Sequence, residues 1–386
     1  MFISETHLPQ VLPPDRYTSQ EQYECEIEHL FKPGWHFIGC LDDIPNDGDY
    51  FTYDLFGHPI IVWNKDGEIH AFLNVCAHRF STLRDDPCGN LCSLHCQYHG
   101  WEYDTSGETR KIPDAPSFKP MEKGSLGLKK YRIEFLGQAI YLTLAKEGPT
   151  LEEVLGPGYE TGRRLFSTDR RLLLTTSYEV NANWKIKIEN TLESYHIELI
   201  HPETFAIRPD AQICEHQIEP GFTTFRTSQP PPKKRDSRLN AMAHKIAGVP
   251  FSEEYIHHLY YPSIMMVETG LIGIAESTFP LSPSKSRVLL KFFAYTGPKE
   301  KLSARLLYRG IRFWGKRFFT KVVMEDAGIL PSIQKGMESN DVPSEGLISI
   351  REERINHFQD FILRATSGDD PSAASDDTPP IHPIAS

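Results

Sequence analysis

Two short cysteine–histidine pairs are the residues whose types and spacing are best suited to chemistry. Cys76-x-His78 and Cys96-x2-His99 are separated by 17 residues. Each pair sets one thiolate and one imidazole on a short turn, so two adjacent turns can present all four donors to a metal centre. The spacing alone is compatible with an iron–sulfur cluster and with a single zinc ion, and two nearby cysteines complicate the choice of ligands, Cys88 and Cys92.

A second set of possible ligands lies in the segment NWKIKIENTLESYHIELIHPETF. Glu193 and His196 are three residues apart and project from one face of a helix, whereas His201 is about 140° away from His196 on a regular helix. Pro202 disfavours helical geometry at His201, so we expect the helix to end or distort between the two histidines. Their imidazoles can then converge, although H-x4-H by itself also fits two ordinary histidines near a helix end.

The elements around the first group indicate a small antiparallel β domain. Short runs of β-branched and aromatic residues fill 35–144, and turn sequences such as Asn46-Asp47-Gly48 and Lys65-Asp66-Gly67 separate them. A helical lead-in precedes this region, with Ser19 as its N-cap and Pro33-Gly34 at its end.

The second group lies in a mixed region that begins after Pro149. We expect a helix over 184–200 with a core face made of Trp184, Ile188, Leu192, Tyr195 and Leu199. Further strands are predicted around 222–227, 258–267, 271–279 and 287–296, and two long helices over 300–319 and 321–339. An exposed loop is predicted at Pro230-Pro231-Pro232, and the last residues lack the hydrophobicity to order themselves.

Composition excludes several classes of protein. The 386 residues carry 41 basic and 52 acidic side chains, a net charge of −11, so the basic excess that nucleic acid requires is missing. No window reaches the 18 or so apolar residues of a membrane span, and the first residues lack the features of a signal peptide. We therefore expect a cytoplasmic protein with no nucleic-acid or membrane partner. Its seven cysteines favour metal ligation over disulfides.

The first segment closely resembles the Rieske iron–sulfur domain, whose pattern is C-x-H, 15 to 17 residues and C-x2-H, followed here by Gly100-Trp101. The resemblance implies a [2Fe-2S] cluster in which Cys76 and Cys96 hold one iron and His78 and His99 hold the other. Two positions depart from the family pattern, because Phe80 replaces a common glycine and Gln97 a common proline.

The second segment is similar to the catalytic helix of Rieske non-haem iron oxygenases, in which two histidines and a distant aspartate bind Fe(II) and leave positions open for O2. The resemblance implies His196, His201 and Asp326 as iron ligands, and it favours Asp326 over the neighbouring Glu325 mainly through the family pattern. It also places Asn190 near the iron without ligating it. Glu193 is implied to bridge His196 to the cluster ligand His99 of the next subunit.

The implied protein is the terminal oxygenase (alpha) subunit of a multicomponent system. The resemblance implies an α+β fold: an N-terminal Rieske-type antiparallel β domain and a C-terminal catalytic domain with a helix over an antiparallel sheet. The predicted divisions are a helical lead-in (1–34), the Rieske domain (35–148), the catalytic domain (149–365) and a disordered tail (366–386). A homotrimer is also implied, because the two centres within one chain are too far apart for efficient electron transfer.

The implied activity uses O2 and electrons that originate from NAD(P)H. They arrive through a separate flavin and iron–sulfur reductase, with a ferredoxin as a further possible component. Glutamate at position 193 is similar to the branch that oxidises quaternary-ammonium substrates, which predicts monooxygenation of a small amine by hydroxylation or N-demethylation. Aromatic-ring cis-dihydroxylation is the alternative, and a Rieske or zinc-stabilised electron-transfer module is the non-catalytic one. Five residues are conceivable walls of a substrate cavity: Tyr260, Met265, Met266, Glu268 and Glu276.

Overall fold

A computed structural model gives the structure of the chain, and it describes residues 1–122, 124–204, 207–228, 234–296, 302–343 and 346–367. The loop predicted at 230–232 lies outside these ranges, as does the predicted tail from residue 368 onward. Within them, none of the helices combines the length and the apolar content that a membrane span requires.

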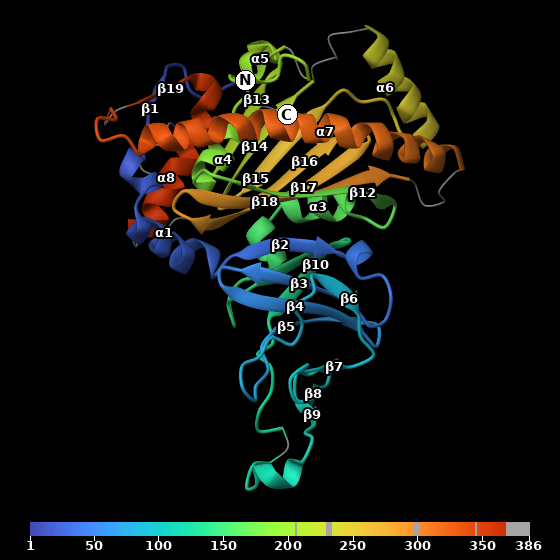
Figure 1. Cartoon of the computed structure of the whole chain (residues 1–386). Helices are drawn as coiled ribbons and strands as arrows, with labels where there is room; N and C mark the ends of the chain where they lie inside the picture. The colour runs from blue at the N-terminus through green and yellow to red at the C-terminus, as the bar shows by residue number, and fades with distance from the viewer. Residues whose placement is uncertain (123, 205–206, 229–233, 297–301, 344–345, 368–386) are drawn as a thin grey trace.

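The N-terminal β domain occupies the lower half of the molecule in Figure 1. One sheet has the order β5-β4-β3-β6, a second has the order β10-β11-β2, and a small sheet, β7-β8-β9, extends from the first towards the tip. Asp66 and Gly67 both have positive φ in the predicted turn between β4 and β5, as a tight hairpin requires. The strands are β2 (Trp35–Cys40), β3 (Asp49–Leu55), β4 (His58–Lys65), β5 (Glu68–Leu73), β6 (Cys88–Asn90), β7 (Leu94–His95), β8 (Glu102–Tyr103), β9 (Thr109–Lys111), β10 (Arg132–Leu136) and β11 (Ala139–Thr143).

The C-terminal domain is built on a seven-stranded antiparallel sheet of order β12-β18-β17-β16-β15-β14-β13. The long helix α7 (Leu302–Met337) lies across the upper face of this sheet together with α4 (Trp184–Thr191), and α8 (Glu353–Ser367) packs at one end (Figure 1). The strands are β12 (Arg170–Val180), β13 (Glu215–Glu219), β14 (Phe222–Thr227), β15 (Tyr255–Tyr260), β16 (Ile264–Thr269), β17 (Ile272–Ser282) and β18 (Lys285–Tyr295). The other helices are α2 (Leu151–Leu155), α3 (Gly158–Leu165), α5 (Ile197–Ile200) and α6 (Lys234–Ala247). This arrangement confirms the predicted α+β class with helices over an antiparallel sheet.

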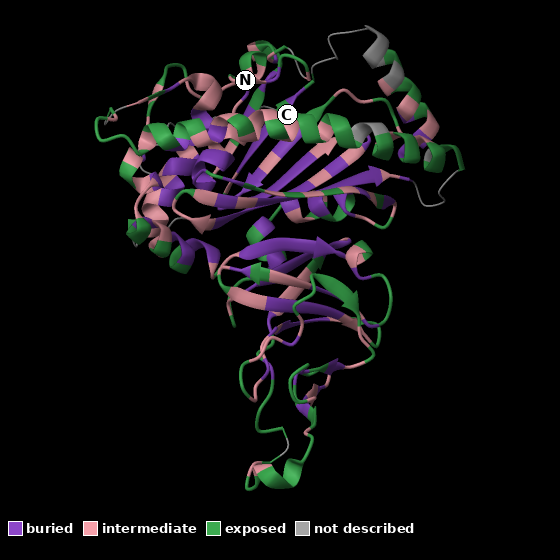
Figure 2. Cartoon of the chain, in the orientation of Figure 1, coloured by how far each residue is buried: buried purple, intermediate pink, exposed green. Residues whose placement is uncertain are grey.

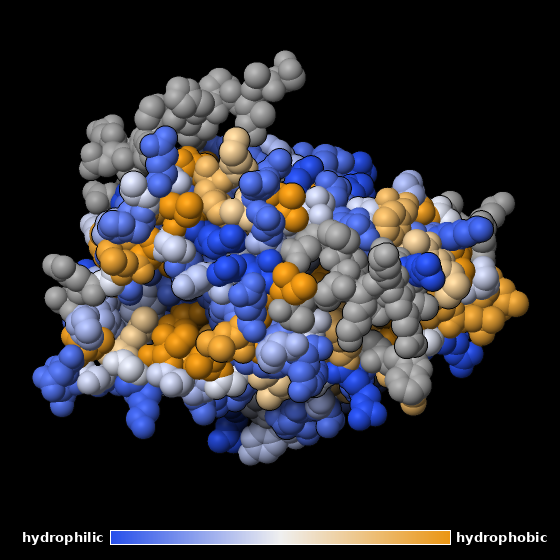
Figure 3. All heavy atoms as spheres, turned by 90° about the horizontal axis from the view of Figure 1, so that it is seen from above, coloured by the Kyte–Doolittle hydropathy of each residue, from blue (hydrophilic) through white to orange (hydrophobic). Residues whose placement is uncertain are grey.

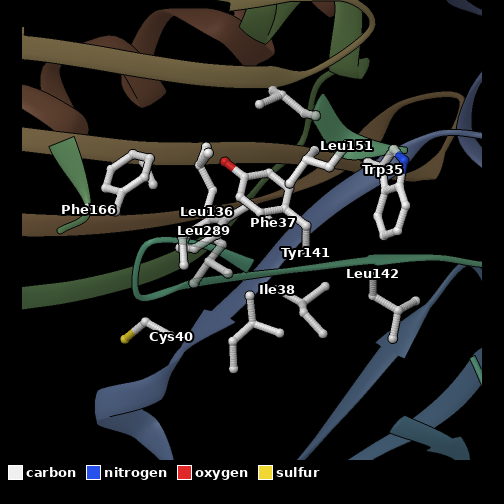
Figure 4. Close-up of a cluster of buried hydrophobic side chains, with 14 of the residues drawn as sticks. Trp35, Phe37, Ile38, Cys40, Leu136, Tyr141, Leu142, Leu151, Phe166 and Leu289 are labelled. Atoms are coloured by element: carbon white, nitrogen blue, oxygen red, sulfur yellow. The ribbon is translucent and has the colours of Figure 1, made fainter. Parts of the chain in front are cut away.

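A shared hydrophobic core joins the two domains. Phe37 of β2 and Tyr141 of β11 pack in one buried cluster with Leu151 of α2, Phe166 after α3 and Leu289 of β18 (Figure 4). The central strands of the large sheet are therefore buried on both faces, as Figure 2 shows. This continuous apolar contact holds the two domains in a fixed relation.

The N-terminal segment packs against the C-terminal domain, and its Phe31 also contacts Phe56 of the β domain. Its helix α1 (Gln20–Glu26) begins at the predicted N-cap, because Ser19 accepts a hydrogen bond from the Gln22 amide. The helix continues as a π-helical turn (Ile27–Phe31), and the preceding strand β1 (Leu8–Pro9) pairs with β19 (Leu347–Ile348) near the other end of the chain. Residues from both ends thus complete the core around α4.

Three predicted elements, one strand and two helices, were wrong in their extent. The strand expected over 258–267 is the hairpin of β15 and β16, which turns at Tyr261-Pro262-Ser263 because a proline cannot continue the ladder. The two helices expected over 300–319 and 321–339 are the single helix α7, which passes through Thr320 without a break.

Candidate metal centres

The two cysteine–histidine loops lie side by side at the tip of the β domain and have the same backbone turn. In the first loop the Phe80 amide donates to the Cys76 carbonyl at 3.1 Å, and in the second the Gly100 amide donates to the Cys96 carbonyl at 3.0 Å. The φ angle of Phe80 is 60° and that of Gly100 is 71°, so the turn requires a left-handed residue at this position. This explains why a glycine is common where the chain has Phe80, which is 80% exposed and strained.

The two thiols point into the domain. Cys76 and Cys96 are both buried, and the Tyr103 hydroxyl lies 3.1 Å from Cys76 Sγ. The Tyr98 amide donates to Cys96 Sγ at 3.4 Å. Burial raises the pKa of the Cys76 thiol, whereas the Tyr103 hydroxyl and the His78 amide act to lower it. Hydrogen bonds of this kind to cluster sulfurs adjust a reduction potential. Tyr103 was not predicted from the sequence, because its contact depends on the pairing of β7 with β8.

The two imidazoles lie next to each other at the surface of the tip. The rings of His78 and His99 are 4.9 Å apart between centroids, and His78 stacks on Trp101. His78 Nδ1 is buried without a hydrogen-bond partner among the described residues, as expected of an atom that binds a metal. Three or more donors within 4.8 Å of one another, the condition for a single ion, do not occur here in the described chain. The four residues therefore fit a two-iron cluster better than one tetrahedral zinc.

The second group lies where α4 gives way to α5, and the predicted helix over 184–200 is broken there. The break comes earlier than expected: α4 ends at Thr191, His196 is the N-cap of α5 and His201 is its C-cap. Glu193 Oε2 accepts hydrogen bonds from the amides of Tyr195 and His196, so this side chain stabilises the turn between α4 and α5. As a consequence Tyr195 and Leu199, predicted to face the core, are 56% and 84% exposed.

His196, His201 and Asp326 converge on one point, with donor atoms within 4.8 Å of one another. Asp326 Oδ1 lies 3.4 Å from His196 Nε2 and 3.0 Å from His201 Nε2. The Asn190 amide acts on the Asp326 carboxylate and lowers its pKa. Among the described residues, the buried Oδ1 has no hydrogen bond of good geometry although it faces both rings. Two imidazole nitrogens and a carboxylate oxygen arranged in this way fit a divalent iron.

Each imidazole is held from behind by a second carboxylate. Glu193 Oε1 contacts His196 Nδ1, and Glu325 Oε2 lies 2.9 Å from His201 Nδ1 and accepts the Thr204 hydroxyl at 2.7 Å. Carboxylates that accept the outer N–H of a metal-binding histidine fix its tautomer and orientation. Glu325 was considered from the sequence only as an alternative to Asp326, whereas the structure gives the two neighbours different contacts.

The electrostatics of the triad match a site for a cation. Burial opposes charge on the imidazole, yet Asp326 and Glu193 raise the pKa of His196 to about 9. Burial alone would raise the pKa of Asp326, but the two imidazoles and the Asn190 amide hold it well below its usual range. The carboxylates thus attract positive charge to this point, and a metal ion would replace the protons on the rings.

The residues predicted as cavity walls divide between the two faces of the sheet. Met265 and Glu276 are cross-strand partners on the face that α4 and α7 cover. For Tyr260, Met266 and Glu268 the prediction was wrong, because they point to the opposite face. There Tyr260 and Met266 pack towards Gly158 and Gly162 of α3, and Glu268 pairs with Arg164 of α3.

A shallow hollow of about 400 Å³ is lined by the chain neighbours of two triad residues, Pro202 and Glu325. Figure 3 shows the molecule from above, with hydrophobic and hydrophilic side chains mixed on this face. The hollow is lined by residues around α5 and α7, namely Leu199, Ile200, Pro202, Glu203, Lys321, Glu325, Gly328 and Ile329. A larger hollow of about 1020 Å³ lies away from both metal groups, against β5 and β10 of the other domain.

Comparison with known families agrees with both groups of residues. A Rieske [2Fe-2S] domain model matches residues 34–132. A model described as the ring hydroxylating alpha subunit (catalytic domain) matches residues 171–368, which is 198 of the 386 residues. The chain belongs to this family. It combines a Rieske [2Fe-2S] domain with the catalytic domain of the ring hydroxylating alpha subunits, the two domains of a Rieske non-haem iron oxygenase.

Several known proteins are similar to this alpha subunit. The glycine betaine monooxygenase oxygenase subunit of Chromohalobacter salexigens is 32% identical over 200 residues, which cover 50% of this chain and only 43% of that protein. The chloroplastic choline monooxygenase of Atriplex hortensis is 25% identical over 360 residues, covering 90% and 76%. The crystal structure of the quaternary ammonium Rieske monooxygenase CntA in complex with L-carnitine superposes with a TM-score of 0.73 at 20% identity, covering 92% and 94%, and shows the same fold.

Proposed function

We propose that the chain is the terminal oxygenase component that monooxygenates a small amine. The observation that carries this proposal is the triad of His196, His201 and Asp326 in the same chain as two cysteine–histidine loops. Bound iron would supply the O2 chemistry, with electrons delivered through the cluster. We also propose that the protein is cytoplasmic and that its domains divide after residues 34, 148 and 365.

The residues of this chain have distinct roles in the proposal. Cys76, His78, Cys96 and His99 hold the cluster, and the triad holds the mononuclear iron. Glu193 and Glu325 fix the orientation of the two imidazoles, and Asn190 fixes the Asp326 carboxylate without binding the metal.

The substrate class is supported by the relatives that act on quaternary ammonium compounds. In the proposed reaction one atom of O2 enters a C–H bond beside nitrogen. The other atom leaves as water, with two electrons from the reductase and two protons. An N-methyl group hydroxylated in this way is lost as formaldehyde, which gives N-demethylation.

A homotrimer is proposed because of the distance between the two centres within one chain. Figure 1 shows the loops of the tip and the helix α5 at opposite ends of the molecule. In the proposal the tip of one subunit, where His99 is exposed, lies against Glu193 of the next. Electrons reach the cluster from a separate reductase, directly or through a ferredoxin.

The first test is the content of iron, zinc and acid-labile sulfide in anaerobically purified protein, with an electron paramagnetic resonance spectrum after reduction. About three irons and two sulfides per chain with a Rieske-type spectrum are expected, because the cluster takes two irons and the triad one. Two irons that do not increase on addition of Fe(II) would favour the electron-transfer module. Zinc without sulfide would overturn the proposal.

Variants test the assigned roles. His196→Ala and Asp326→Ala should remove one iron and all turnover while the cluster spectrum stays, and full activity in either would refute the triad. Glu193→Gln should retain both metals and block electron transfer between subunits, with the exposed Glu198→Gln in α5 as its control. Reaction under ¹⁸O₂ separates the two activities, since a hydroxylated product gains one labelled atom, a demethylated amine gains none because the oxygen leaves with formaldehyde, and a cis-diol gains two.

A further inference from the structure

Lys187 is a buried lysine of α4 that has no role in the proposal above. Its Nζ lies 2.8 Å from Glu276 Oε1 on β17, and the two side chains are only 4% and 6% exposed. Glu276 lies directly across from Met265 and therefore on the sheet face that α4 and α7 cover. Burying two charges costs free energy that an ion pair recovers only in part, so this pair needs a reason beyond stability.

The pair lies beside the metal triad. Lys187 precedes Asn190 by three residues in α4, so the two side chains share one helix face, with Cβ atoms about 5–6 Å apart. Asn190 in turn lowers the pKa of the Asp326 carboxyl, so its amide acts on this member of the triad. From the sheet side, burial together with the charges of Glu276 and Asp326 raises the pKa of Tyr178 on β12, so both carboxylates act on this phenol. The ion pair and the triad therefore adjoin the same region between α4, α7 and the sheet.

The pair also leaves hydrogen-bonding capacity unused. An ammonium group has three donors, and Lys187 Nζ has a single acceptor in the described part of the chain, Glu276 Oε1. Thr278 follows on the same face of β17, and its buried hydroxyl has no partner among the described residues. Buried polar groups without partners are costly, so an anionic group on a ligand would find matching donors here.

We propose that Lys187 binds a carboxylate of the substrate, so the substrate is an amine that also carries a carboxylate, such as a betaine or an N-methylated amino acid. The inference rests on the proposed amine oxidation and narrows its substrate class. Glu276 holds the ammonium in place, and the N-methyl end of the substrate faces the triad. An amino alcohol lacks an anionic group that could pair with the Lys187 ammonium.

Binding of three probes to the iron-loaded oxygenase under anaerobic conditions, measured by titration calorimetry, tests this inference. Glycine betaine has both charges, 3,3-dimethylbutanoate has the same shape with the carboxylate alone, and choline has the ammonium alone. The wild-type protein should bind the two carboxylates more tightly than choline. Lys187→Met should weaken both carboxylates about tenfold to hundredfold, the usual effect of losing a hydrogen bond to a charged group, and leave choline unchanged.

Three further variants separate recognition from folding. Lys187→Arg retains the charge and should bind the carboxylates within about tenfold of wild type. The double variant Lys187→Met, Glu276→Met removes the whole pair, leaves no unpaired buried charge and should lose carboxylate binding while it still folds. Lys291→Met is the matched control, since Lys291 is a buried lysine of the same sheet that pairs with Asp43 on the opposite face and should not affect any probe.

The outcomes distinguish this inference from the proposed function. If the wild-type protein binds neither carboxylate, or if Lys187→Met binds all three probes as wild type does, the inference is wrong. If choline alone is bound and oxidised, the proposed amine oxidation is supported and the carboxylate-binding role of Lys187 is refuted. If carboxylates bind through Lys187 but no amine is oxidised when a reductase is supplied, the carboxylate-binding role of Lys187 is supported and the proposed function is refuted.

Discussion

Replacing Glu26 should destabilise the protein strongly, although this residue lies far from the metal ligands in the sequence. Glu26 Oε1 lies 2.6 Å from Lys185 Nζ, and its Oε2 accepts the Trp184 indole N–H at 2.7 Å. The side chains of Glu26 and Lys185 are 1% and 0% exposed. In Glu26→Ala the ammonium would remain buried without its counter-charge, which costs about 3–5 kcal/mol when one partner of a buried pair is removed. This is a large part of the 5–15 kcal/mol that usually stabilises a folded protein.

The free energy of unfolding in urea, followed by tryptophan fluorescence, measures this effect. The exposed pair of Glu28 and Lys32, one turn further along, is the matched control, and Glu28→Ala should cost less than about 1 kcal/mol. The double variant Glu26→Gln, Lys185→Met removes both charges and should recover most of the loss. A cost below about 1 kcal/mol for Glu26→Ala, or a double variant no more stable than that single one, would refute the reasoning.

Three other predictions concern the tip, the iron site and acid stability. Phe80→Gly should raise the free energy of unfolding by about 1 kcal/mol in urea denaturation, because glycine adopts the left-handed conformation at this position without the strain of a side chain. An equal gain in Phe80→Ala would contradict this explanation. Glu325→Gln should weaken binding of the mononuclear iron about 10- to 100-fold in an Fe(II) titration and leave the cluster intact, with the exposed Glu203→Gln as control; unchanged affinity would exclude its orienting role. Burial lowers the pKa of His36 from 6.5 to about 4 in the folded protein. As the pH falls, His36 is therefore protonated in the unfolded chain before it is protonated in the folded one. Stability should therefore fall as the pH drops from about 6.5 to 4, by up to about 3 kcal/mol from this residue, and a flat profile between pH 7 and 4.5 would count against a neutral buried imidazole.

The candidate cluster ligands could be predicted from the sequence because their spacing is local, whereas Asp326 was assigned mainly through the family pattern. Two cysteine–histidine pairs define their own turns, and Pro202 limits the helix near His201. The local pattern missed the turn between α4 and α5, in which the Glu193 side chain accepts hydrogen bonds from two backbone amides. That interaction exposes Tyr195, which the helical period alone would bury.

The side chains that surround the candidate metal ligands could not be predicted, because their positions depend on contacts between distant elements. A strand with apolar residues on both faces does not reveal which face meets the helices, so Met265 and Met266 could not be told apart. The role of Glu325 could not be predicted either, because its partner His201 is 124 residues away in the chain. Alternation along a strand is informative only where one face is exposed to solvent.

The pairing of the two ends of the chain sets the order in which the protein can assemble during synthesis. Pro9 of β1 pairs with Leu347 of β19, so β1 must wait for a segment 338 residues further on. At about 5–20 residues per second a ribosome needs about 20–70 s for that stretch. The strands of the Rieske domain, by contrast, all lie within residues 35–143 and need no later segment to form their sheets. The cluster domain can therefore fold and receive its iron and sulfide before the domain with the iron triad is complete.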